Sequence, residues 1–514
     1  MPAVNSLRLH RSGRHFRSMV PGRRFFYSIV DHAVFRLSTK KRYHSRNLFR
    51  RLRHHSEQNN RMQITFNDLD TDVVDIILRM FYADSGAGTD GINTPPPITI
   101  GAVCSQWRNF VRARPMYWGF ITLRLSVKNL RIMEELFADW IQCASTNISL
   151  DISISTTDVA VDLPSTFKSL ILGTHRQWEK FSCDDVGSIW SSFFSTAQSS
   201  DPFPLLHTVS FDLYLHDHID FRPAKNLRYV YISNSSITTP TFNWKHLRDL
   251  AWYQTTVKDV EVFLGELRDI YDMELVFDDN EQRKFGKAKS CILNHLGIFA
   301  VEGDSTNLQT VLNVITAPNI TILCITLVPD GDSCWVNSLL DMKIRSSWFQ
   351  SLTHCTFSDI DTSEHDVVEI LRGLCSMRVL KFYRPQFLLS DYFVSSLDPS
   401  FAFGGRCLLP CLEDFECYRA IISFTPNALF ATLVHRLALW ENRAFAPNAQ
   451  EYKITDVRPI TLFRVSHDCK EWSPLNGYLS PSHTKEWDKK AQSLKNMGIT
   501  IDMIFIDLPE DNGF

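Results

Sequence analysis

A helix-start signal, an amphipathic helix and a short apolar strand follow one another repeatedly in the second half of this chain. The clearest case has the capping signal Ser363-x-x-Asp366, an apolar helical stripe over 367–374 and an apolar strand over 377–382. The same order recurs over 256–277 and 306–327, and Thr425-Pro426 opens a further helix. Helices that alternate with short apolar strands predict parallel strands joined by crossovers, so we expect an α/β structure here.

A shorter pattern, apolar-x-x-apolar-x-apolar, accompanies the expected strands. It begins at Leu206, Leu227, Leu247, Ile270, Leu293, Ile320, Leu352, Met377 and Leu412. Leucine-rich repeats place a strand on this pattern. With 44% apolar residues the pattern is also frequent by chance, and the Asn or Cys that normally closes the repeat is missing. We therefore predict an irregular leucine-rich-repeat-like α/β solenoid over residues 166–508, and a closed α/β domain stays open as the alternative.

Two shorter helical stripes lie upstream of this region. The first runs from Leu69 to Phe81, and the second contains Val103, Cys104 and Trp107. A polar insert over 84–97, rich in Gly, Asp and Pro, separates them. Helices this short are not stable alone in water, so each must bury its apolar stripe. The stripes predict a small helical module over 62–125, followed by a connecting region over 126–165.

That module resembles an F-box, the domain through which substrate receptors of cullin-RING ubiquitin ligases dock their adaptor. The likeness is carried by Leu69, Ile76-Ile77, Val103-Cys104, Trp107, Pro115 and Trp118. Asp70 stands where the family pattern has proline. The insert, and short runs at 175–178, 242–247 and 408–412, are similar to F-box proteins of mushroom-forming fungi.

The resemblance implies a fold of class α + α/β, with a three-helix F-box module before the solenoid. It implies a non-catalytic receptor subunit of an SCF-type E3 ligase, which docks a Skp-type adaptor and its cullin complex. The implied adaptor-binding or module-core residues are Leu69, Val73, Ile77, Val103, Cys104, Trp107 and Trp118. An unknown protein substrate would then bind the strand face of the repeats.

Aromatic residues are the candidate substrate anchors on that face, because interface hot spots favour Tyr and Trp. The candidates are Tyr229, Tyr231, Trp252 and Tyr253. Ordinary strand packing is the alternative for all four.

Charge is distributed unevenly along the chain. Residues 1–61 hold 15 Lys or Arg and two acids, Asp31 and Glu57, whereas the remainder holds 39 basic and 55 acidic residues. We expect a disordered basic extension over 1–61, and a nuclear-import or nucleic-acid patch and a transit peptide stay open. The acidic remainder argues against nucleic acid as the main partner.

The sequence offers no catalytic, cofactor or metal motif. Gly286-Lys287 lacks the rest of a phosphate-binding loop, 330–332 is expected to be a solvated turn, and the histidines over 207–218 lack metal-ligand spacing. The 12 cysteines contain no Cys-x-x-Cys pair and are expected to be reduced. No stretch is apolar enough for a membrane span or a secretory signal, so we expect a cytoplasmic or nuclear protein without membrane contact.

Two other functions stay open at this point. One is a repeat-based interaction scaffold whose F-box is degenerate, which Asp70 favours. The other is a nucleic-acid-associated protein that uses its basic N-terminus.

Overall fold

The computed structural model describes residues 72, 75–76, 96–103, 105–156, 163–184, 203–212, 221–233, 242–277, 290–328, 333–401, 407–442, 457–468 and 481–506. The chain divides into two compact units, Met1–Pro96 and Pro97–Phe514. Nearly all described residues belong to the second unit, an α/β unit built on a large parallel sheet.

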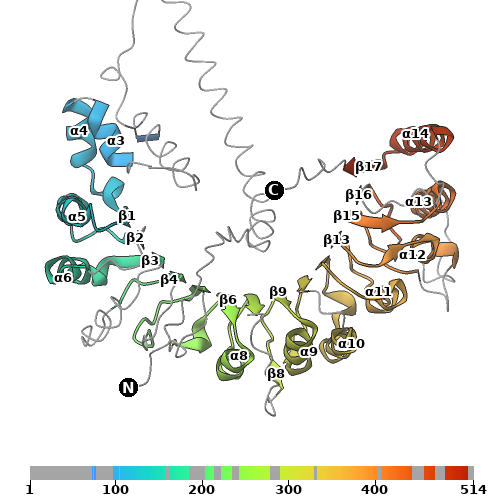
Figure 1. Ribbon diagram of the computed structural model, residues 1–514, viewed down its shortest axis with the longest axis horizontal. Coiled ribbons are helices and arrows are strands. Elements are labelled where there is room, and N and C mark those ends of the chain that lie inside the picture. The colour runs from blue at the N-terminus through green and yellow to red at the C-terminus, as the bar shows by residue number, and fades with distance from the viewer. Residues whose placement is uncertain are drawn as a thin grey trace, which may run out of the picture. The chain divides into compact units, whose positions relative to one another are not determined.

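Fifteen of the described strands form one sheet, and every pairing printed for it is parallel (Figure 1). Fourteen follow one another across the sheet in the order of the chain, with β1 and β17 at the two ends, and β14 pairs with β15. Each strand is therefore joined to its neighbour by a crossover, as the alternation of helices and strands predicted. The strands are β1 (Phe120–Leu125), β2 (Leu150–Thr156), β3 (Trp178–Asp184), β4 (Thr208–Asp212), β5 (Tyr229–Ser233), β6 (Asp249–Thr255), β7 (Asp272–Phe277), β9 (Ile298–Gly303), β11 (Ile322–Leu327), β12 (His354–Ser358), β13 (Val379–Tyr383), β14 (Leu388–Leu389), β15 (Asp414–Ile422), β16 (Leu462–Asp468) and β17 (Thr500–Ile506).

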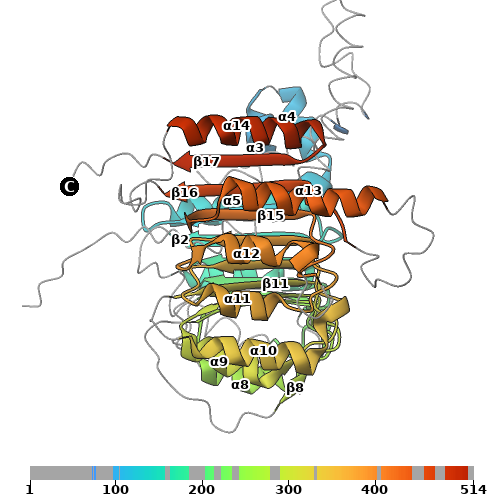
Figure 2. The same ribbon diagram turned by 90° about the vertical axis from the view of Figure 1, so that its right-hand side faces the viewer.

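The crossover helices lie on one face of this sheet (Figures 1 and 2). They are α5 (Leu130–Ala144), α6 (Ser165–Gly173), α8 (Val257–Leu264), α9 (Ser305–Val314), α10 (Cys334–Ser346), α11 (Glu364–Leu371), α12 (Asp391–Ser396), α13 (Pro426–Asn442) and α14 (Pro481–Asn496). Short 3-10 helices add η2 (Pro115–Trp118), η3 (His175–Gln177), η4 (Trp244–His246), η5 (Trp348–Gln350) and η6 (Pro399–Phe401), and β8 (Cys291–Ile292) pairs with β10 (Ile315–Thr316). None of the crossover helices that the structure describes lies on the other face, which we call the strand face.

Side-chain capping fixes where several helices begin. Ser363 caps α11, since its hydroxyl accepts a hydrogen bond from the Asp366 N–H at 3.1 Å and donates one to the Asp366 carboxylate at 2.7 Å, which confirms the predicted capping signal. The Thr425 hydroxyl likewise accepts from the N–H of Ala428 at the start of α13. The sequence pattern over 306–327 places the start of α9 at Thr306, but the structure shows Asp304 as the cap, because the Asp304 carboxylate accepts from the backbone N–H of Asn307 at 2.7 Å.

The short apolar pattern marks the buried side of the sheet. All three of its positions are buried in eight of the nine expected segments. In the ninth, the expected third position, Ile298, faces the other way, and Leu296, Phe299 and Val301 are the buried set. The strands therefore bury one side chain in two against the helices, as the period of a half-buried strand requires.

The same pattern extends further towards the N-terminus than the sequence suggested. Buried triplets also stand at Trp118-Ile121-Leu123 and Trp178-Phe181-Cys183. The sheet thus begins at Phe120, and the stretch 126–165 contains α5 and β2 of that sheet. These residues were expected to end the helical module and to connect it to a later domain, and both boundaries are corrected accordingly.

A left-handed residue stands at the same level of four strands, where it either ends the regular strand pairing or shifts its register. Gln254, Asp359, Arg384 and Arg419 all have φ between 49° and 56°. Two of their backbone N–H groups bond to the next strand, from Asp359 to the Tyr383 carbonyl and from Arg384 to the Tyr418 carbonyl, each at 2.8 Å. These backbone bonds join neighbouring strands at this level. Left-handed geometry is costly for these residue types and is offset by such bonds.

Candidate protein-interaction surfaces

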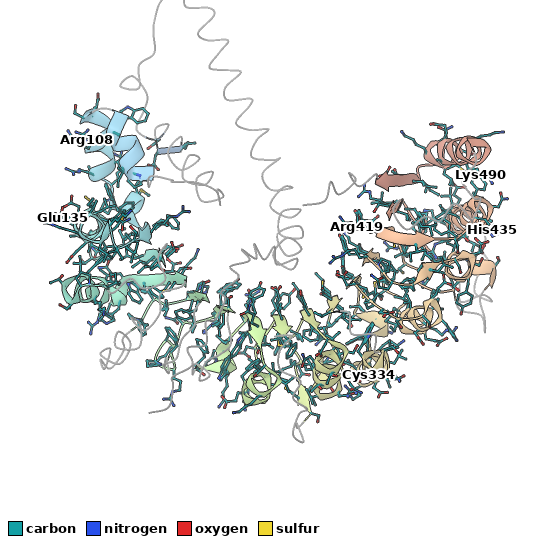
Figure 3. All side chains as sticks on the ribbon, in the orientation of Figure 1. Arg108, Glu135, Cys334, Arg419, His435 and Lys490 are labelled. Atoms are coloured by element: carbon teal, nitrogen blue, oxygen red, sulfur yellow. The ribbon has the colours of Figure 1, made fainter. Side chains whose placement is uncertain are left out.

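Two helices, α3 (Pro96–Val103) and α4 (Ser105–Arg112), precede the sheet. The Arg108 guanidinium, labelled in Figure 3, bonds from α4 to the Gly101 carbonyl of α3 at 3.0 Å. Val111 is buried, whereas Trp107 is half-buried. Of the expected adaptor-binding residues, Leu69, Val73, Ile77 and Cys104 lie outside the described residues, and Val103 is described only as the last residue of α3.

Trp118 belongs to the start of the sheet. Its indole N–H donates to the Val111 carbonyl at 3.0 Å, and its own carbonyl accepts from the indole of Trp140 in α5 at 2.6 Å. The two indole rings meet edge to face with centroids 5.1 Å apart. Trp118 is 7% exposed, and its hydrogen bonds connect α4 to α5, the first crossover helix. Its position corresponds to core packing and not to an accessible adaptor contact.

The strand face carries the residues that alternate with the buried ones. Three of the four expected substrate anchors stand on it, Tyr229 and Tyr231 in β5 and Tyr253 in β6. Tyr231 is 39% exposed. Trp252 points to the opposite side, where it is 1% exposed and stacks on Phe263 of α8 at 5.3 Å. The expectation for Trp252 is therefore replaced by a core position, since adjacent residues of a strand face opposite ways.

Acidic side chains lie beside these tyrosines. Asp249 of β6 is the direct neighbour of Asp272 in β7, and Glu274 follows Asp272 on the same side of its strand. The Tyr253 hydroxyl donates to the Glu274 carboxylate at 2.9 Å. Together these residues form the β5–β7 patch, which comprises Tyr229, Tyr231, Asp249, Tyr253, Asp272 and Glu274.

Burial and mutual repulsion perturb the carboxyl groups of the β5–β7 patch. Burial, with repulsion from Asp249 and Glu274, raises the pKa of Asp272 to about 7. Burial also raises the pKa of Glu274 to about 7, against the opposing effect of the Tyr253 hydrogen bond. The pKa of Asp249 is raised by burial as well, and the nearby Arg248 partly opposes this. The carboxylates are thus held where their charge is poorly stabilised.

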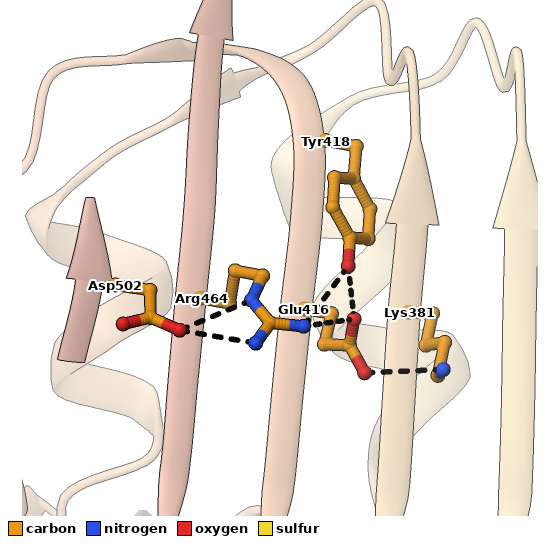
Figure 4. Close-up of polar contacts among 5 residues, drawn as sticks. All are labelled: Lys381, Glu416, Tyr418, Arg464 and Asp502. Carbon is orange, nitrogen blue, oxygen red and sulfur yellow. Dashed lines mark hydrogen bonds and ion pairs between the residues drawn. The ribbon is translucent and has the colours of Figure 1, made fainter. Parts of the chain in front are cut away.

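A different arrangement occupies the strand face nearer the C-terminus (Figure 4). Lys381 of β13 pairs with Glu416 of β15 at 3.1 Å, and Arg464 of β16 pairs with both Glu416 and Asp502 of β17. The Tyr418 hydroxyl donates to Glu416. Burial opposes ionisation of Glu416, but the hydrogen bond from Tyr418 and the charge of Lys381 outweigh it, and its pKa is lowered. Two bases and two acids neutralise each other in this network.

Sequence reasoning identified the tyrosines but not their acidic neighbours. Asp249 and Asp272 lie a whole crossover apart in the chain and become neighbours only through the strand register. A signal was nevertheless available, because both acids immediately precede the apolar core of their strands. Applying the period of two to every expected strand would have placed them on one face.

The described parts of the chain contain no group of three or more His, Cys, Asp or Glu residues arranged to hold a metal ion. Within the same parts, no helix combines the length and the apolar character needed to cross a membrane. No protein-family model matches the chain, and no curated protein matches it.

Proposed function

We propose that this chain is a non-catalytic substrate receptor of an SCF-type cullin-RING ubiquitin ligase. Its N-terminal helical segment docks a Skp-type adaptor, and its strand face binds a protein substrate. The receptor holds the substrate beside a ubiquitin-charged enzyme and raises the effective concentration of the two. Such a receptor works in the cytoplasm or the nucleus, where the ligase acts.

The observation that carries the binding role is the one-sided sheet. Its helices cover one face, whereas the strand face carries the residues that alternate with the buried ones, and several of these are polar or aromatic and partly exposed, such as Tyr229, Tyr231 and Asp272. Parallel sheets of ordinary α/β domains are covered on both faces, and their strands are apolar throughout. An extended strand face of this kind supports repeat-type protein recognition, and we propose that the sheet is a leucine-rich-repeat-like solenoid.

Adaptor docking is supported by the residues that lead into the sheet. The helix α4 carries Trp107 in a half-buried position, with exposed polar residues on both sides of it. A large aromatic side chain that remains partly accessible beside a buried neighbour, Val111, is suited to an interface anchor. The F-box resemblance assigns this tryptophan to the adaptor-binding module.

Co-purification with a Skp-type adaptor tests this proposal. Full-length wild-type chain should retain purified adaptor, and Trp107→Ala should abolish that retention. Trp440→Ala is the matched control, because Trp440 is 42% exposed on α13 at the far end of the sheet, and this variant should retain adaptor normally. Failure of the wild-type chain to retain any adaptor would eliminate the ligase role.

A protein-interaction scaffold without a ligase role is the second candidate. The position of Trp118 favours it, because a residue of the F-box pattern packs against α5 of the sheet unit. Under this alternative the strand face binds its partner, whereas the wild-type chain and Trp107→Ala both fail to retain adaptor.

A further inference from the structure

The β5–β7 patch carries acidic side chains without basic partners on its strands, whereas the acids nearer the C-terminal end of the sheet are paired with bases. Among the described strand-face positions of β4, β5, β6, β7 and β9, none is Lys or Arg. Three acids gather on the two neighbouring strands β6 and β7, Asp249, Asp272 and Glu274. The network of Figure 4 forms a direct contrast, because each acid in it has a basic partner on a neighbouring strand.

The acids are also poorly satisfied by the protein itself. The Oδ1 atom of Asp249 is buried and accepts no hydrogen bond from the described residues. Glu274 is 7% exposed and is held in place by Tyr253. The described base next to them, Arg248, lies over the ring of Tyr271 at 5.6 Å. The side chains of Asp249 and Asp272 are only half-buried, so a cation from outside the chain can contact them, and it would stabilise their charge more than water does.

The geometry favours long basic side chains over a metal ion. Asp272 and Glu274 are two residues apart on one strand, about 7 Å along it, and Asp249 is on the next strand, about 5 Å away. Carboxylates spread in this way do not converge on one ion, and no metal-holding group is found among the described residues. Lysine or arginine side chains of an extended segment can reach each carboxylate separately.

Tyrosine rings supply the second half of the recognition. Tyr229 and Tyr231 stand on β5 beside the acids, in register with Asp249 and Ala251 of β6. Rings of this kind attract an ammonium or guanidinium group placed over their faces. They also offer apolar area to the methylene groups of a lysine side chain.

We infer that the β5–β7 patch binds a basic segment of a protein partner, which presents lysine or arginine side chains to Asp249, Asp272 and Glu274 between the tyrosine rings. This inference names the chemistry of the substrate and rests on the proposed binding role of the strand face. It does not depend on adaptor docking. The patch then acts as a specificity element, because it rejects acidic segments and selects basic ones.

Fluorescence anisotropy with a labelled peptide of alternating lysine and alanine tests the inference on the full-length chain. In an extended peptide this sequence places lysine at every second residue, which matches the spacing of Asp272 and Glu274. Wild type should bind this peptide and should not bind the same peptide with glutamate in place of lysine. Asp272→Asn/Glu274→Gln should weaken binding about tenfold or more, since two charge-assisted contacts are lost.

Asp139→Asn/Asp341→Asn is the matched control. It removes the same charge from exposed positions on α5 and α10, outside the strand face, and should change the affinity less than about twofold. Equal weakening in both double variants would mean that only bulk charge attracts the peptide, and unchanged binding in Asp272→Asn/Glu274→Gln would place the peptide elsewhere. Either result overturns the inference.

Two further measurements separate this inference from its alternatives. If a second copy of the chain, and not a separate partner, occupied the patch, the wild-type chain would self-associate in sedimentation, and Asp272→Asn/Glu274→Gln would abolish this self-association. Adaptor retention by the same variant should be normal. Retained adaptor without peptide binding rejects the inference alone, whereas peptide binding without retained adaptor rejects the ligase role alone.

Discussion

Neutralising two carboxylates of the β5–β7 patch should stabilise the protein and reshape its pH dependence. Asp272→Asn and Glu274→Gln keep the shape of each side chain, and the Gln carbonyl can still accept from Tyr253. The pKa of Asp272 is raised from 3.8 to about 7 and that of Glu274 from 4.5 to about 7. At about 1.4 kcal/mol per pKa unit, ionisation of these groups in the folded state costs about 4 and about 3 kcal/mol.

These two costs are not additive, because part of the Asp272 shift is repulsion from Glu274. We expect the free energy of unfolding of the double variant to be higher by about 3–5 kcal/mol at about pH 8.

The groups that face these carboxylates are Tyr229 and Tyr231 from β5, Asp249 and Tyr253 from β6, Glu302 from β9 and Cys324 from β11. None of them supplies a compensating positive charge.

The sign follows from proton binding. Between about pH 4 and about pH 7 the folded wild type holds protons on Asp272 and Glu274 that the unfolded chain has released. The free energy of unfolding therefore decreases as pH rises through this window, and it should decrease less in the double variant. Urea denaturation followed by tryptophan fluorescence at several pH values measures both curves. Parallel curves, or a double variant less stable than wild type at about pH 8, would refute this reasoning.

Two further substitutions test the fold. Arg436→Met should destabilise the chain by about 3–5 kcal/mol, because the fully buried guanidinium donates to the carbonyls of Leu397, Leu409 and Pro410, which would lose their partner. Denaturant unfolding should show a much smaller effect for Arg372→Met, whose guanidinium forms an exposed ion pair. Ser363→Ala should cost about 1 kcal/mol through loss of the α11 cap, and Ser363→Asp should restore most of it in the same assay.

The alternation of helices and parallel strands could be predicted from local signals. Ser363 indicates the start of its helix, because it caps the N–H of a residue only three positions away. The buried triplets follow from strand periodicity. The sequence places Trp118 in the helical module. Its hydrogen bonds to Val111 and Trp140 form only through tertiary packing, so no local pattern indicates them. The sequence around it equally matches the short apolar pattern, so both interpretations were available at this position.

The interaction surface was harder to anticipate than the fold. Aromatic residues alone suggested it, and aromatic residues are as common in cores as at interfaces, which is why Trp252 was assigned to the wrong face. The acidic half of the patch depends on register, since Asp249 and Asp272 meet only when β6 and β7 pair. The register between parallel strands that are joined by a long crossover is set by how their apolar faces pack, and the sequence of one strand alone does not show it.

Under the proposed function, one chain bridges an adaptor and a basic protein segment. Beads carrying the lysine–alanine peptide, incubated with purified Skp-type adaptor, test it in one measurement. We predict that adaptor is recovered when wild-type chain is present, and is lost with Trp107→Ala or with Asp272→Asn/Glu274→Gln. Peptide beads that capture the wild-type chain but no adaptor would contradict the claim.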